Sequence, residues 1–191
     1  MRPLNTTRSG RPPLASAYTS AMQIAIVGLG SILMGDDGVG PYCVEIFQGS
    51  YAFPPEVNLV ELGTPGPEFG HILLEWDRLI VIDAVQAKGE PGEVRLYRRD
   101  EILSRPSPQR MSPHDPSLRD ALLTAEFVGG GPEEVLLVGV IPAKVEMGTE
   151  LSPEVKAALP LVEGAVLEEL ATWGVKPSRT SSGTSRVWWE R

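Results

Sequence analysis

Apolar residues in this chain form short continuous runs, separated by stretches in which they recur at helical spacing. Four runs have the length and composition of buried strands, at residues 22–27, 57–61, 79–82 and 135–141. Helical spacing begins at four positions, Val39, Phe69, Asp115 and Pro153. Strands that alternate with helices in this way predict a mostly parallel sheet covered on both faces, in a three-layer α/β/α sandwich.

A fifth strand is expected at residues 92–98, where apolar and charged residues alternate. Val94 and Leu96 share one face of this strand, and charged residues occupy the other, wet face. This pattern predicts an antiparallel strand at an edge of the sheet. The following stretch, residues 99–113, contains three prolines and is expected to be a surface excursion.

The pattern divides the chain into one domain and two polar ends. Residues 1–21 carry arginines among Ser, Thr and Pro, with no apolar run, and are expected to be a disordered extension. Met22 stands at the start of the first strand, so a start codon assigned too early explains this extension more simply than a functional leader. Residues 22–174 form the single domain, and residues 175–191 are expected to be a disordered tail.

Composition narrows the range of partners. The chain has 191 residues and a formal net charge of -8. Because nucleic-acid binding depends on clustered Lys and Arg, nucleic acid is not expected as a partner. No segment approaches the roughly 20 consecutive apolar residues that span a bilayer, so we expect a cytoplasmic protein without membrane insertion. The single cysteine, Cys43, excludes an internal disulfide framework and is expected to pack in the core.

The connection after the first strand is the most informative segment. Residues 28–40 are rich in glycine and contain the adjacent acids Asp36 and Asp37 just before a helix. In an open α/β sheet, such a connection lies where ligands bind. Helix capping by an Asp is one alternative. Dinucleotide binding is another, but the third glycine of that motif is missing, and two acids would face the pyrophosphate.

Two distant carboxylates and one imidazole are expected to converge on this side of the sheet. Asp37 follows the first strand, Asp83 closes the third, and His114 stands before a helix. Parallel strands end at the same edge, which brings the two acids together. The set would suit a divalent first-row metal with open coordination positions. A metal-free pair acting as general acid and base is the alternative, and each residue alone also fits an ordinary capping or solvated role.

The chain resembles the hydrogenase maturation endopeptidases, which trim the C-terminus of the large subunit of nickel-iron hydrogenases. The resemblance runs from residue 22 to about residue 173 and implies a twisted five-stranded sheet between helices. It rests on ordered motifs: Gly28-Leu29-Gly30, Asp36-Asp37-Gly38-Val39-Gly40, Gly63-Thr64-Pro65-Gly66, Asp83-Ala84, Ser112-Pro113-His114, Val138-Gly139-Val140-Ile141-Pro142 and Leu151-Ser152-Pro153.

The resemblance implies roles for three of these residues. Asp37, Asp83 and His114 would be the metal-binding and catalytic trio. The implied metal is a divalent ion, nickel, supplied by the implied partner, the hydrogenase large-subunit precursor. The leading hypothesis is peptide-bond hydrolysis in which this nickel marks the precursor as ready. A non-catalytic chaperone that holds metal or precursor without cutting it is the alternative from another class.

A second motif is implied to recognise the substrate, through Glu61, Gly63 and Thr64. Here the chain departs from the family, which usually has Asp-Gly where Glu61-Leu62 stands. Glu61 keeps the charge but reaches farther, and Leu62 removes a permissive backbone position. Ser31 also stands where the family commonly has Asn, whose side-chain amide could brace the loop.

Overall fold

A computed structural model describes residues 22–104 and 115–180 of the chain. The strands are Ile24–Leu29 (β1), Tyr51–Ala52 (β2), Val57–Gly63 (β3), Arg78–Ala84 (β4), Val94–Arg98 (β5), Glu134–Val140 (β6) and Ser178–Arg179 (β7). The α-helices are Val39–Ser50 (α1), Phe69–Ile72 (α2), Arg99–Ser104 (α3), Asp115–Val128 (α4) and Pro153–Thr172 (α5). Two 3-10 turns are Gly35–Gly38 (η1) and Leu73–Glu75 (η2).

One five-stranded sheet, in the order β3-β1-β4-β6-β5, forms the middle of the molecule. β1 pairs in parallel with β3 and β4, and β4 pairs in parallel with β6. β5 is antiparallel to β6 at the edge. These findings confirm the predicted mostly parallel sheet and its antiparallel edge strand.

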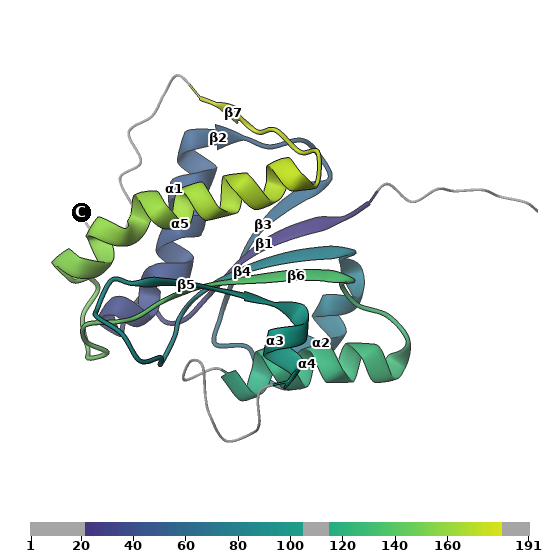
Figure 1. Cartoon of the computed structure of the whole chain (residues 1–191), viewed down its shortest axis with the longest axis horizontal. Helices are drawn as coiled ribbons and strands as arrows, with labels where there is room; N and C mark the ends of the chain where they lie inside the picture. Colours follow the sequence, from purple (N-terminus) through teal and green to yellow (C-terminus); the bar gives the residue numbers. More distant parts are fainter. Residues whose placement is uncertain (1–21, 105–114, 181–191) are drawn as a thin grey trace, which may run out of the picture.

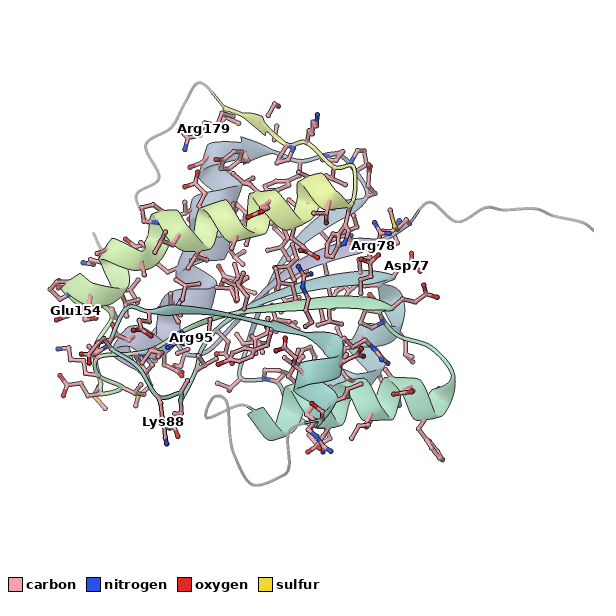
Figure 2. The ribbon with its side chains drawn as sticks, viewed as in Figure 1. Asp77, Arg78, Lys88, Arg95, Glu154 and Arg179 are labelled. Atoms are coloured by element: carbon pink, nitrogen blue, oxygen red, sulfur yellow. The ribbon has the colours of Figure 1, made fainter. Side chains whose placement is uncertain are left out.

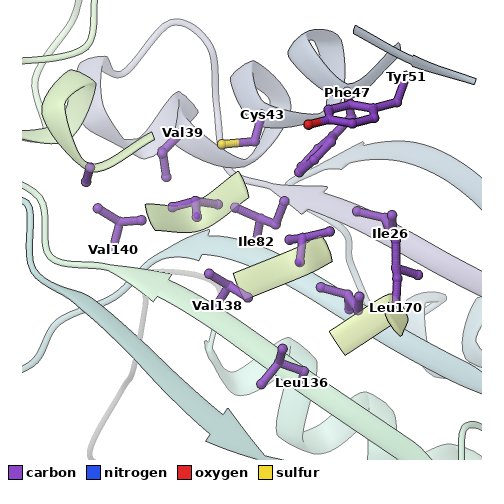
Figure 3. Packing of buried hydrophobic residues seen from close by; sticks show 14 of the residues in the cluster. Ile26, Val39, Cys43, Phe47, Tyr51, Ile82, Leu136, Val138, Val140 and Leu170 are labelled. Carbon is purple, nitrogen blue, oxygen red and sulfur yellow. The ribbon is translucent and has the colours of Figure 1, made fainter. Parts of the chain in front are cut away.

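Helices cover both faces of this sheet, as Figure 1 shows, with α1 and α5 on one side and α2, α3 and α4 on the other. Side chains of each strand alternate between two apolar layers. Ile24 and Ile26 of β1 belong to the layer under α1 and α5, which Figure 3 shows from close by. Ala25 and Val27 belong to the opposite layer. The three-layer α/β/α sandwich is therefore confirmed.

The two long helices on the α1/α5 side begin as the sequence predicts. Ser152 caps α5, because its hydroxyl accepts a hydrogen bond of 3.3 Å from the amide of Val155, and Pro153 follows in the first turn. The helix continues through Pro160. Cys43 of α1 is buried as expected, and this burial raises the pKa of its thiol to about 12.

Two local predictions on the other side were wrong. The expected surface excursion at residues 99–113 begins with α3, which holds Ile102 fully buried. On β5, Leu96 is half exposed, whereas Tyr97 on the opposite face is buried. The prediction of one apolar and one wet face for β5 failed because both faces make apolar contacts. Val94 packs in one layer and Tyr97 in the other.

The first residues of the expected tail are also ordered. Val175 is buried, and Ser178–Arg179 pair as β7 with β2 in an antiparallel ribbon. Arg179 donates hydrogen bonds to the Tyr51 hydroxyl (3.2 Å) and to Glu163 of α5 (2.8 Å). These contacts tie residues 175–180 to the domain. The rest of the predicted disordered ends, residues 1–21 and 181–191, lies outside the described residues. Among the described residues, no helix is long and apolar enough to cross a membrane.

Candidate functional site

The carboxyl ends of the parallel strands bring three connections together at one edge of the sheet. Gly28 of β1 lies beside Ile82 of β4, and Leu29 lies beside Gly63 of β3. The segments that follow these strands therefore begin side by side. Ligand sites of open α/β sheets lie at this edge.

Glycines allow the chain after β1 to lie very close to the strand ends. A Cβ added to Gly40 would lie 2.2 Å from the carbonyl oxygen of Leu29 and 2.4 Å from that of Ile82. The start of α1 therefore lies directly against β1 and β4. Its contact on β4 is Ile82, which immediately precedes Asp83. Gly30 has a φ of 109°, and an added Cβ would lie 1.8 Å from the carbonyl oxygen of Asp37. Only glycine fits both positions without backbone movement.

Asp37 is held in this crowded turn. It lies in η1 with 3% of its surface exposed, and its Oδ2 accepts a hydrogen bond of 2.7 Å from the backbone amide of Ser31. The Ser31 hydroxyl does not make this contact; it accepts a longer bond, 3.4 Å, from the amide of Leu33. A backbone group thus holds the Asp37 carboxylate at the position where the sequence departs from the family.

Asp83 lies in β4, paired with Gly139 of β6, and is also 3% exposed. η1 packs against β4, so the structure brings Asp37 and Asp83 to the same edge, as the sequence predicted. His114 lies outside the described residues. Figure 1 shows that α4, which begins at the next residue, starts on the side where the parallel strands end. Within residues 22–104 and 115–180, no three His, Cys, Asp or Glu side chains form a group that could hold a metal ion.

The predicted recognition motif adjoins the acidic turn, residues 30–38, which carries Asp36 and Asp37. The backbone amide of Gly30 donates a hydrogen bond of 2.8 Å to the carbonyl oxygen of Gly63. Glu61 and Thr64 are exposed on either side of Gly63. Partial desolvation, and to a smaller extent the negative charge of Glu45 on α1, raises the pKa of the Glu61 carboxyl. The motif is therefore an accessible surface joined to the acidic turn through the backbone.

Asp36 is the important residue whose role the sequence did not show. It is fully buried, and its carboxylate accepts hydrogen bonds from the backbone amides of Ala143, Lys144 and Ser152. The sequence showed two adjacent acids before a helix but contained no signal for the direction in which each side chain points. The two neighbours in fact serve different segments, since Asp37 contacts Ser31.

Fold and site together define an α/β protein whose buried acids lie at the carboxyl edge of a mostly parallel sheet. The comparison with known families identifies its chemistry: a family model described as hydrogenase maturation protease (HycI) matches residues 41–169. The chain belongs to the hydrogenase maturation protease family and is a peptidase.

Individual relatives agree with this assignment. The chain is 39% identical over 157 residues to the hydrogenase expression/formation protein HupM of Azotobacter chroococcum, covering 82% of this chain and 75% of that protein. It is 33% identical over 155 residues to the hydrogenase 2 maturation protease of Escherichia coli, covering 81% of this chain and 94% of that protein. The solved structure of the hydrogenase maturating endopeptidase HybD from E. coli superposes with a TM-score of 0.76, at 33% identity, covering 84% and 99% of the two chains.

Proposed function

We propose that this peptidase removes a C-terminal peptide from the large-subunit precursor of a nickel-iron hydrogenase. The names of its relatives support hydrogenase maturation as the process. The observation that carries the proposal is the pair of buried acids, Asp37 and Asp83, at one edge of the sheet in a member of this family. Buried acids that gather at the ligand-binding edge of an α/β sheet are candidates to position or activate a reacting group.

We further propose that Asp37, Asp83 and His114 bind nickel that the precursor already carries. Carboxylate oxygens and an imidazole nitrogen are suitable ligands for a divalent first-row metal. Two of these residues are buried acids, Asp37 in the turn that follows β1 and Asp83 in β4, and β1 and β4 are neighbours in the sheet. This placement fits a cationic group arriving with the substrate. The metal, when bound, would supply Lewis acidity toward the scissile carbonyl.

The residues of this chain would then position and move protons. The Ser31 amide holds one oxygen of Asp37 at 2.7 Å, which restricts rotation of that carboxylate. A carboxylate so held could accept a proton from the attacking water, with Asp83 as the second acid of the pair. Glu61, Gly63 and Thr64 would contact the precursor beside the cleaved bond, because this turn is exposed and joined to Gly30.

Co-expression of the precursor with the full chain, followed by intact-mass measurement of the precursor, tests the proposal. Wild-type protein should shorten the precursor by a C-terminal peptide. Asp37→Asn should slow this processing at least about 100-fold, since it removes an acid proposed to work at the reacting centre. Nickel-loaded precursor should be cut, and nickel-free precursor should not.

Asp77→Asn is the matched control. Asp77 immediately precedes the same strand that contains Asp83, but it is exposed at the opposite end. Figure 2 shows it far from Lys88, which follows the carboxyl end of β4, and from Glu154 at the start of α5. This variant should process the precursor at the wild-type rate. Equal trimming of nickel-loaded and nickel-free precursor would reject the nickel part of the proposal. A precursor whose mass never changes with the wild-type protein would instead favour a non-catalytic chaperone.

A further inference from the structure

Asp36 makes an unusual set of contacts for an acid beside a proposed catalytic residue. Its Oδ2 accepts hydrogen bonds from the backbone amides of Ala143 (2.8 Å) and Lys144 (3.0 Å), and its Oδ1 accepts one from Ser152 (2.6 Å). The side chain is fully buried. An ionised carboxylate only accepts hydrogen bonds, so it is well suited to three converging backbone donors.

These donors belong to the connection between β6 and α5. Residues 143–150 of this connection are exposed, so burial does not hold them in place. Backbone hydrogen bonds instead join the connection to the acidic turn: Gly35 donates to Gly148 (2.8 Å), and Gly148 donates to Leu33 (2.9 Å). An isolated β-bridge pairs Met34 with Gly148. Asp36 is the side chain that completes this attachment from the buried side.

The position of Asp37 depends on the same attachment, because Asp37 directly follows Asp36 within η1, which is a single short turn. Its carboxylate accepts a hydrogen bond from the amide of Ser31, whereas the partners of Asp36 belong to the β6–α5 connection. A displacement of Asp36 would therefore move the backbone that carries Asp37. We propose that Asp36 is a positioning residue, which anchors the β6–α5 connection to the acidic turn and thereby fixes the carboxylate of Asp37. The catalytic consequence rests on the proposed function of Asp37.

Backbone amide hydrogen exchange on the free, full-length protein tests this proposal without substrate or metal. In Asp36→Asn, one acceptor oxygen becomes an NH2 group, which faces amide donors and cannot accept from them. Exchange at Ala143, Lys144 or Ser152 should rise about 10- to 100-fold, the loss expected for a hydrogen bond to a charged acceptor. Exchange at Ser31 should rise as well, because this amide donates to Asp37 and reports its position.

Asp37→Ala is the matched control in this experiment. It should release the amide of Ser31 and leave those of Ala143, Lys144 and Ser152 protected as in the wild type. Wild-type exchange at Ser31 in Asp36→Asn would overturn the positioning role, even if the β6–α5 connection were loosened. This outcome does not depend on whether the precursor is the substrate.

A second pair of variants tests the proposal if Asp36→Asn does not fold. Ser152 has a φ of -62°, which proline can adopt, so Ser152→Pro removes the amide that donates to Asp36. Ser152→Ala keeps that amide and removes only the hydroxyl that caps α5. Faster exchange at Ser31 in Ser152→Pro than in Ser152→Ala is expected, and equal exchange would overturn the proposal.

Kinetics separate positioning from a merely structural role. Per folded molecule, Asp36→Asn should lower kcat about 10- to 100-fold and change KM much less, because the exposed turn of Glu61, Gly63 and Thr64 is intact while the acid is misplaced. Wild-type kcat in a variant with released Ser31 would overturn the catalytic consequence. Failure of the wild-type protein to cut the precursor would instead reject the proposed function and leave the exchange result standing.

Discussion

Two glycine-containing connections leave the same edge of the sheet and differ sharply in how tightly they are held. After β1, Gly30 and Gly40 have no room for a side chain, since an added Cβ would lie 1.8 Å and 2.2 Å from backbone oxygens. At the end of β3, Gly63 has a φ of 58°, but nothing lies within 4 Å of an added Cβ. Asp37 is buried in the first connection, whereas Thr64 is exposed in the second.

Under the proposed function, this difference corresponds to a division of work at the edge of the sheet. Groups that take part in chemistry must be held in a fixed geometry, which the first connection achieves through close backbone contact. A surface that receives another protein must be accessible, which describes the second connection. The hydrogen bond from Gly30 to Gly63 links the two, so a precursor bound at the exposed turn would lie next to the buried acids.

The largest effect is expected from Gly40→Ala. The added methyl group would meet the carbonyl oxygens of Leu29 and Ile82, which belong to two central strands and cannot move independently. We expect the free energy of unfolding to fall by about 3 kcal/mol or more, because backbone atoms rather than a flexible side chain oppose the methyl group. Urea denaturation followed by circular dichroism measures this loss.

The control for Gly40→Ala is the same substitution at Gly164, in the middle of α5. Nothing lies within 4 Å of an added Cβ there. Alanine should stabilise this helix by about 0.5–1 kcal/mol, since glycine loses more backbone freedom on folding. A Gly40→Ala variant as stable as the wild type would show that the first connection is less tightly held than its geometry indicates.

Much of the fold could be predicted because its signals are local. Continuous apolar runs identified β1, β4 and β6, which are buried on both faces, and Ser152-Pro153 marked the start of α5. Segments with weaker or mixed signals were missed. α3 lies in a stretch that its prolines suggested was irregular, and β7 is a two-residue strand whose pairing with β2 depends on distant partners.

The candidate site was predictable only in part, for the same physical reason. Topology alone brings Asp37 and Asp83 to one edge, because parallel strands end together. Topology does not determine the direction of a side chain within a turn, so the contacts of Asp36 with the β6–α5 connection had no sequence signal. His114 was predicted from the chain order and the resemblance, and it stays a prediction.

A smaller effect is expected from Gly63→Ala. The left-handed φ of 58° is unfavourable for alanine by about 1–2 kcal/mol, but no atom blocks the methyl group. The variant should therefore remain folded and lose about 1 kcal/mol of stability in urea denaturation. A loss as large as that of Gly40→Ala would remove the contrast between the two connections.

The smallest effect is expected from Glu61→Gln, and it should depend on pH. The folded state raises the pKa of this carboxyl, through desolvation and then through Glu45, so the folded protein holds the proton more tightly than the unfolded chain. Stability is therefore lost as the pH rises through the folded pKa and is not lost below the unfolded pKa. Gln removes this loss, so the variant should match the wild type near about pH 3 and exceed it near about pH 7.

Because Glu61 is exposed, the gain should stay below about 0.5 kcal/mol in paired urea titrations. A variant less stable than the wild type at the higher pH would show that the Glu61 charge has a favourable partner, and that the second connection is more tightly organised than its open surroundings indicate.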